Sequence, residues 1–177
     1  MSRRDEMGGI EPVTIDGKGH RFLIIEAPYY DDIAAALIDG ALAEFDAAGA
    51  AYDRIEVPGA LEIPQVLGRA VAAGLMTTAT PSGATTAGKY AGAIALGCVI
   101  RGETSHYDIV CNNANHWMME IAMAHGVPLG NAILTVDTHA QAMARASGGR
   151  KGKGADAARA CLRLVQIARE FKEAGST

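Results

Sequence analysis

The sequence predicts an α/β fold, a three-layer α/β/α sandwich with a four-stranded parallel sheet and helices on both faces. Apolar segments of strand length alternate four times with longer segments whose apolar residues recur at helical spacing. Strands joined in this way run parallel through right-handed crossovers. The chain has 177 residues, of which 49% are hydrophobic and 20% charged, so its length and composition suit one globular domain.

The first strand–helix unit follows an N-terminal arm. Residues 1–19 are expected to form a flexible arm, and residues 20–177 a single domain. Residues 21–27 are an apolar segment of strand length. Residues 31–48 place apolar side chains on one helical face, start with two aspartates that favour a helix N-terminus, and stop before Gly49, a typical helix terminator.

The second unit comprises a strand at residues 52–57, closed by a Pro-Gly pair, and a helix at residues 62–73. Pro64 fits that helix only within its first turn. Residues 76–89 are rich in Thr, Gly, Ser and Pro and have no periodicity, which predicts a surface loop.

The third strand, residues 91–100, is the most uniformly apolar segment, as expected for a strand buried on both faces. A helix at residues 107–124 follows it. The fourth strand covers residues 131–136, and the next helix is capped by Asp137 or Thr138, with Thr138 and a glutamine at capping-box spacing.

Residues 147–154 break the fourth helix, and a last helix covers residues 155–173. A sheet of four strands has edges that need protection. We expect a neighbouring subunit or the N-terminal arm to cover them.

Composition excludes several functional classes. The net charge is −4 without a basic stripe, which argues against nucleic-acid binding, and no apolar run reaches the length of a membrane span. The N-terminus lacks the apolar segment of a secretory signal. Three cysteines, odd in number, indicate a reducing, cytoplasmic compartment, and neither they nor the five histidines have the spacing of metal ligands.

The most informative segment is GCVIRGETSHYDIV, residues 97–110. A buried strand ends there in a small polar turn that begins at Arg101, and His106 follows just before a helix. Ligands of open α/β sheets bind beyond the carboxyl ends of the strands, where helix N-termini attract anions. A histidine in such a turn can transfer protons near neutral pH. An ordinary solvated loop would also carry these residue types.

The other turns after strands add complementary groups. Tyr29 and Tyr30 could stack on a flat ring, Glu62 could accept hydrogen bonds from hydroxyls, and Arg145 could hold a phosphate. The sequence shows no serine or cysteine nucleophile paired with a histidine and no glycine-rich nucleotide-binding motif. Each turn alone fits ordinary loop chemistry, whereas the four together favour a binding site.

Four motifs closely resemble the lumazine synthase family, enzymes of the penultimate step of riboflavin biosynthesis. They are VPGALEIP, ALGCVIRGETSHYDIV, GNAILTVDTHAQAMARA and KGADAA, and the resemblance covers about residues 20–172 in order. It implies a transferase that condenses 5-amino-6-(D-ribitylamino)uracil with 3,4-dihydroxy-2-butanone 4-phosphate. The products are 6,7-dimethyl-8-ribityllumazine, orthophosphate and water.

The resemblance also implies a flavodoxin-like fold, a homopentamer with sites between adjacent subunits, and no cofactor or catalytic metal. In this family the link between the last two helices, here residues 147–154, influences whether pentamers close into an icosahedral shell. The sequence leaves that question open.

The resemblance also implies roles for single residues. His106 matches the proton donor, Tyr29 the aromatic that stacks on the pyrimidine, and Asn131 a residue contributed across the subunit interface. The residues expected to contact the pyrimidine substrate are Tyr29, Ala60, Leu61, Glu62, Cys98, Val99, Ile100 and Asn131. The residues expected to bind the phosphate are Glu103, Thr104, Arg145 and Lys153.

The chain departs from the commonest family pattern in four places. Family members often have Arg-Phe in place of Pro28-Tyr29, and phenylalanine in place of Leu61 and of Asn131. The loop at residues 76–89 is longer than usual. The Pro28-Tyr29 and Leu61 differences affect ring stacking, and so concern substrate affinity more than reaction type.

Two other functions fit parts of the sequence. A non-catalytic binder of lumazine or riboflavin would keep the fold and the pocket, but the presence of His106, Arg145 and Lys153 argues against it. A flavodoxin-type electron carrier would need a phosphate-binding loop after the first strand, and APYYDD does not provide one.

Overall fold

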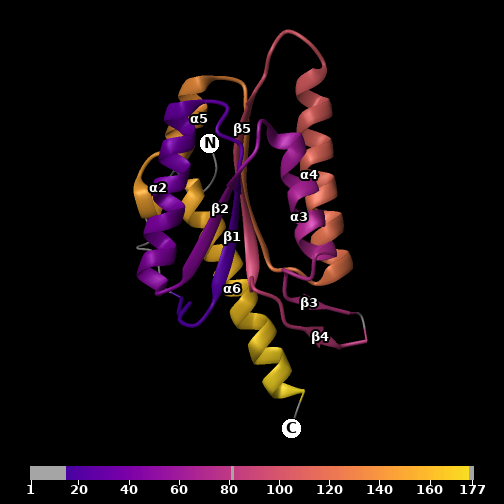
Figure 1. The fold of residues 1–177 in the computed structure, drawn as a ribbon. Coiled ribbons are helices and arrows are strands. Elements are labelled where there is room, and N and C mark those ends of the chain that lie inside the picture. The colour runs from indigo at the N-terminus through magenta and orange to yellow at the C-terminus, as the bar shows by residue number, and fades with distance from the viewer. Residues whose placement is uncertain (1–14, 81, 176–177) are drawn as a thin grey trace.

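The protein is described by a computed structural model that covers residues 15–80 and 82–175. Its centre is a parallel sheet of four strands in the order β2-β1-β5-β6 (Figure 1). These strands are β1 (Arg21–Glu26), β2 (Ala51–Glu56), β5 (Gly92–Ile100) and β6 (Leu129–Val136). The predicted number of strands and their parallel direction are confirmed.

Helices cover both faces of the sheet, as predicted (Figure 1). One face carries α2 (Asp31–Ala48), α5 (His139–Ala146) and α6 (Lys153–Ala174). The other carries α3 (Ile63–Ala72) and α4 (His106–His125). Two short 3₁₀ turns, η1 (Ala60–Glu62) and η2 (Gly149–Lys151), precede α3 and α6. The result is a three-layer α/β/α sandwich of the flavodoxin-like type.

Several helix ends lie at residues that favour them. Gly49 ends α2 in the left-handed conformation at φ 68°, which glycine adopts without strain. Pro64 lies in the first turn of α3, where its missing N–H costs no hydrogen bond. Thr138 caps α5, because its hydroxyl accepts a hydrogen bond from the backbone N–H of Gln141 at 3.2 Å.

The segment 76–89 differs from the prediction of an irregular loop. It contains a small antiparallel pair, β3 (Thr78–Ala79) and β4 (Thr85–Thr86). Strands of two residues are too short to show alternation in a sequence, so the pattern could not reveal them. The pair lies beside the ends of α3 and α4 at the amino ends of the sheet strands (Figure 1).

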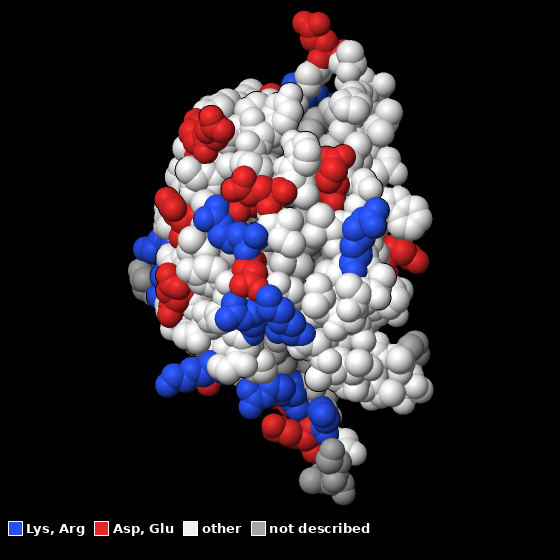
Figure 2. Space-filling model, in the orientation of Figure 1, with Lys and Arg blue, Asp and Glu red and all other residues white. Residues whose placement is uncertain are grey.

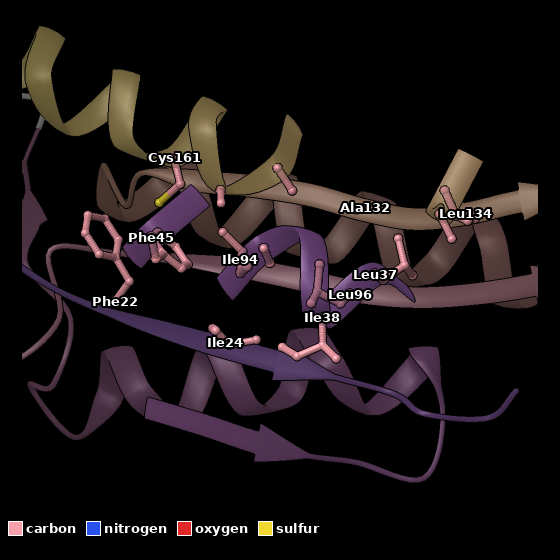
Figure 3. Close-up of a cluster of buried hydrophobic side chains, with 14 of the residues drawn as sticks. Phe22, Ile24, Leu37, Ile38, Phe45, Ile94, Leu96, Ala132, Leu134 and Cys161 are labelled. Carbon is pink, nitrogen blue, oxygen red and sulfur yellow. The ribbon is translucent and has the colours of Figure 1, made fainter. Parts of the chain in front are cut away.

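Apolar side chains fill both faces of the sheet. Figure 3 shows the cluster beneath α2 and α6, where Ile24, Ile94 and Ala132 come from three neighbouring strands. In the same cluster the ring of Phe22 stacks on that of Phe45 with centroids 4.9 Å apart. The second cluster lies beneath α3 and α4. Strand β5 contributes to both, which confirms the prediction that it is buried on both faces.

Strands β1 and β5 form the switch point of the topology. They are neighbours, but β1 leads into α2 on one face and β5 into α4 on the other. Strand β1 ends at Glu26, opposite Leu96, whereas β5 continues to Ile100. Among the described residues, Gly97–Ile100 therefore has β6 on one edge and no strand on the other. A crevice at such a point is where open α/β sheets bind ligands.

Charged side chains border the edge strand β2. Arg54 pairs with Glu26 at 2.7 Å, and Asp53 pairs with Arg21 and Lys89, both at 2.6 Å. Figure 2 shows acidic and basic side chains interspersed on the face that carries β2. Charges of this kind discourage edge-to-edge association of sheets.

Little of the predicted N-terminal arm falls within the described residues. Residues 1–14 lie outside them, and residues 15–19 lead into β1 through a turn, in which the Gly17 N–H donates to the Ala48 carbonyl at 2.8 Å. No helix in the described part of the chain is both long enough and apolar enough to cross a membrane.

Candidate active site

A cavity of about 430 Å³ opens at the carboxyl ends of β1, β2 and β5. The turns after these three strands form its walls, as the position of the switch point predicts. Many of the predicted site residues line it. They are Tyr29, Ala60, Leu61, Glu62, Cys98, Val99, Ile100, Thr104 and His106.

The turn after β5 leads directly into α4, and His106 is the first residue of that helix. The backbone N–H of His106 donates to the hydroxyl of Thr104 at 3.4 Å, and both side chains line the cavity. The N-terminus of a 20-residue helix therefore faces the cavity wall, with the positive end of its dipole. An anion and a proton carrier can meet here.

Arg101 holds this turn in place through its side-chain contacts, although sequence analysis assigned it no specific role. Its guanidinium lies over the ring of Tyr107 at 4.0 Å and pairs with Asp137 at 3.2 Å and with Asp108 at 3.5 Å. These contacts join the start of α4 to the segment after β6.

Another wall is formed by η1, which follows β2. Its residues Ala60, Leu61 and Glu62 all line the cavity, and the Glu62 carboxylate is half-buried. At Gly59 a Cβ would lie 3.1 Å from the Glu62 carboxylate, so the small residue leaves room for that side chain. A carboxylate in this position can accept hydrogen bonds from hydroxyl groups.

The rim of the cavity carries two neighbouring tyrosines. The ring of Tyr29 is 70% exposed and meets that of Tyr30 edge-to-face, with centroids 5.0 Å apart. An exposed ring at the mouth of a cavity is available for stacking on a flat ligand. Burial raises the pKa of Tyr30, so its hydroxyl stays protonated near neutral pH.

Sequence reasoning placed Tyr30 in a functional turn without assigning it to the site, and missed Tyr107. Both line the cavity. Burial is the main cause that raises the pKa of Tyr107, which keeps this phenol neutral too. The position of Tyr107 directly after His106 at a helix start was the available signal.

The floor of the cavity is the free end of β5. Cys98 is buried, and Val99 and Ile100 are half-buried. Burial raises the pKa of the Cys98 thiol to about 11, so this thiol is neutral near pH 7 and is no nucleophile. The exposed edge of this strand end instead offers backbone hydrogen-bonding groups to a ligand.

Within the described chain, four predicted site residues lie outside the cavity lining: Glu103, Asn131, Arg145 and Lys153. The Asn131 amide donates to the side-chain oxygen of Asn115 at 2.6 Å. Arg145 donates to the Gln141 carbonyl at 2.9 Å, and Lys153 pairs with Asp156 at 3.0 Å. Within one chain, the side chains of Asn131, Arg145 and Lys153 thus contact other groups and do not line the cavity.

A second hollow, of about 500 Å³, lies between α3 and α4 and shares Leu61 with the cavity. Gly68 in α3 and Ile121 in α4 form part of its walls, and Trp117 lines it with a side chain that is 52% exposed. We call it the α3–α4 groove. Met123 and Ile109 are further exposed apolar side chains of α4.

No group of three or more His, Cys, Asp or Glu side chains within residues 15–80 and 82–175 is arranged to hold a metal ion. The arrangement can bind a flat polar ring, hydroxyl groups and an anion, and can transfer a proton.

Comparison with known proteins identifies the family. The family model for 6,7-dimethyl-8-ribityllumazine synthase matches residues 19–169. A Rhodopseudomonas palustris protein named 6,7-dimethyl-8-ribityllumazine synthase 1 is 48% identical over 160 residues, which are 90% of this chain and 92% of its own. A Nitrobacter hamburgensis protein, named 6,7-dimethyl-8-ribityllumazine synthase, is 46% identical with the same coverage. The match extends over almost the whole described domain and over the cavity residues, and the chain therefore belongs to the 6,7-dimethyl-8-ribityllumazine synthase family.

Proposed function

We propose that this chain condenses 5-amino-6-(D-ribitylamino)uracil with 3,4-dihydroxy-2-butanone 4-phosphate to give 6,7-dimethyl-8-ribityllumazine, without a cofactor. Membership of the family supports this reaction. The observation that carries the assignment of the site is the cavity at the switch point, because it gathers an aromatic ring, a carboxylate and a histidine at a helix N-terminus.

The pyrimidine substrate binds at the free end of β5. Its flat ring stacks on Tyr29 at the rim, and its polar edge bonds to the backbone of Val99 and Ile100. The ribityl chain runs along η1, where the Glu62 carboxylate accepts hydrogen bonds from its hydroxyls. The exposure of Tyr29 and the missing strand beside Gly97–Ile100 support this arrangement.

The phosphate of the second substrate binds near the N-terminus of α4, where the N–H groups of Glu103 and Thr104 donate to it. Imine formation, phosphate elimination and ring closure each require proton transfers, which His106 provides. Elimination leaves negative charge on the departing phosphate, and donors fixed in advance stabilise that charge. Holding two substrates together supplies much of the remaining acceleration.

The complete site forms between subunits of a homopentamer in the cytoplasm. Asn131, Arg145 and Lys153 of one subunit serve the cavity of the next. The exposed apolar side chains beside the α3–α4 groove support a covered surface there, since large exposed apolar patches mark interaction sites. The three free, buried cysteines fit a reducing compartment.

The test is to mix both substrates with the purified protein and follow the absorbance of the lumazine product. We expect turnover together with a pentamer in sedimentation. A protein that binds lumazine without forming it would be the non-catalytic binder. An Arg145→Ala variant should lose affinity for the butanone phosphate by about 1.5–3 kcal/mol, the usual contribution of a charge-assisted phosphate contact. Equal losses for both substrates would contradict the role of Arg145.

A further inference from the structure

A fully buried carboxylate lies in the C-terminal half of α2, outside the cavity lining. Glu44 is 0% exposed, and its side chain accepts from two arginines that are far away in sequence. Arg150 in η2 donates through Nε at 3.0 Å, and Arg159 in α6 through Nη2 at 2.8 Å. A buried carboxylate stays charged only with such partners, so this cluster ties η2 and α6 to α2.

The ion pairs continue from Glu44 to Lys153. Arg159 uses Nη2 for Glu44 and Nη1 for Asp156, the latter at 3.0 Å. The other oxygen of Asp156 accepts from the Lys153 ammonium, also at 3.0 Å. Charges of alternating sign thus connect the core of α2 to the first residue of α6.

The backbones of the same elements are in direct contact. A Cβ on Gly40 would lie 2.7 Å from the Gly149 carbonyl oxygen, and a Cβ on Gly154 would collide with the Leu37 carbonyl oxygen. No side chain separates α2 from η2 or from the start of α6 at these points. The main chain around Lys153 therefore has a fixed position, and the ion pairs decide where its ammonium lies.

We propose that Glu44 is a positioning residue for the phosphate subsite, acting on Lys153 through Arg159 and Asp156. This inference rests on the proposed function, which gives Lys153 a phosphate contact. Without the Glu44 charge, Asp156 would be the carboxylate that Arg159 still contacts. Arg159 would then compete with Lys153 for it, and the ammonium would lose its fixed direction.

The arginine that transmits this effect has limited freedom. Arg159 bonds Glu44, Asp156 and the Arg150 carbonyl through its two terminal nitrogens. Its Nε is the one buried side-chain nitrogen or oxygen without a hydrogen-bond partner in the described part of the chain. A guanidinium that already has one unsatisfied donor will turn toward a new acceptor when Glu44 is replaced by an uncharged residue.

The experiment compares Glu44→Gln and Asp156→Asn in the full-length assembled enzyme. For each variant, kcat, both KM values and the inhibition constant of inorganic phosphate are measured. We expect the KM for the butanone phosphate and the phosphate inhibition constant to rise about threefold to tenfold, a part of the full value of a charge-assisted contact. The KM for the pyrimidine and kcat at saturation should stay unchanged. Asp156 is nearer the surface, so its variant decides the question if Glu44→Gln does not fold.

The matched control is Glu170→Gln, which removes an exposed pair with Arg163 at 3.0 Å on the same helix and should change none of these constants. Equal increases in both KM values, or unchanged phosphate constants in either test variant, would overturn the proposal. Lys153→Met tests the phosphate role of Lys153 separately from the positioning role of Glu44. Unchanged phosphate constants in that variant would refute the phosphate role of Lys153 itself.

Discussion

The two ends of strand β5 have opposite surroundings. From Ala93 to Leu96 the strand is paired with β1 on one edge and with β6 on the other, and Gly92 just before is paired with β1. From Gly97 to Ile100 only β6 borders it within the described residues. The first end lies in the tightly packed core, and the second forms the floor of the cavity.

This difference shows how one strand can serve both stability and binding. Paired backbone groups and close contacts hold the amino end in place. At the carboxyl end the same strand keeps its direction, because β6 continues beside it, while its other edge is free for a ligand. Changes at the amino end should therefore affect stability, and changes at the carboxyl end should affect catalysis.

The largest expected effect is at the carboxyl end. His106→Ala should lower turnover roughly a hundredfold, because the site loses its general acid–base group, while pyrimidine affinity and unfolding midpoint stay nearly unchanged. Steady-state kinetics and thermal unfolding measure these quantities. His125→Ala, which changes an exposed histidine at the other end of α4, is the control. Equal turnover of His106→Ala and the parent enzyme across the pH range would refute the role.

A pair of glycines tests the comparison within β5 itself. At Gly92 a Cβ would lie 2.6 Å from the Cys161 sulfur and 2.8 Å from the Pro128 carbonyl oxygen, whereas at Gly97 the nearest atom, of Ile63, would be 3.6 Å away. Gly92→Ala should reduce the free energy of unfolding by about 1–3 kcal/mol, the usual cost of overpacking. Gly97→Ala should change it by less than about 0.5 kcal/mol. Similar losses in urea unfolding at one protein concentration would mean that packing is equally tight at both ends.

Asp53, in β2, should affect the pH dependence of stability and not turnover. Hydrogen bonds from Lys89 and Tyr90 lower the pKa of Asp53 from 3.8 to about 2. A carboxylate whose pKa is lowered in the folded state stabilises the protein at pH values above its unfolded-state pKa. This stabilisation is lost as the pH falls from about 4 to 2. Asp53→Asn should therefore flatten the decline in stability between these pH values and leave turnover at pH 7 unchanged. Asp39→Asn, on the exposed side of α2, controls for the loss of one carboxylate.

The smallest expected effect is at Cys98, although it lies in the floor of the cavity. The pKa of its thiol, raised by burial to about 11, keeps it protonated at pH 7 to 8. Cys98→Ser should change turnover by less than about threefold, because a neutral thiol supplies neither a nucleophile nor a charge. A large loss of kcat, with both KM values unchanged, would assign it a chemical role after all.

Most of the fold could be predicted because its elements carry periodic signals. Helix α2 has an apolar face, acidic residues at its start and Gly49 at its end, and its predicted bounds agree with the structure. The strand pair β3 and β4 was missed, since two-residue strands carry no periodicity. The two longest helices, α4 and α6, were predicted with small differences at their ends.

The site was predictable where topology alone brings residues together. Tyr29, Glu62 and His106 follow three different parallel strands, whose carboxyl ends meet at one edge of the sheet. Asn131 lies inside β6, paired with Ala95 of β5, and Arg145 lies near the end of α5. Neither follows the carboxyl end of a strand directly, so the sheet topology does not predict that they reach the cavity. The family resemblance alone predicts that Asn131 serves a site across a subunit interface, and it matches Arg145 to a phosphate-binding arginine.

Glu44 shows a further limit of sequence reasoning. It is one of five acidic residues in an alanine-rich helix, and its two arginine partners lie 106 and 115 residues away in the chain. Nothing in its local sequence distinguishes a solvated glutamate from a fully buried one. Contacts over such separations become visible only when the helices are packed together.

The position of Trp117 in the α3–α4 groove gives the molecule a built-in optical probe. It is the only tryptophan in the chain, and half of its side chain is open to water. An indole emits at shorter wavelength when an apolar surface replaces the water around it. A subunit that covers the groove should therefore shift the emission of the whole protein toward the blue, and stepwise dilution should reverse the shift at the concentration where the subunits separate.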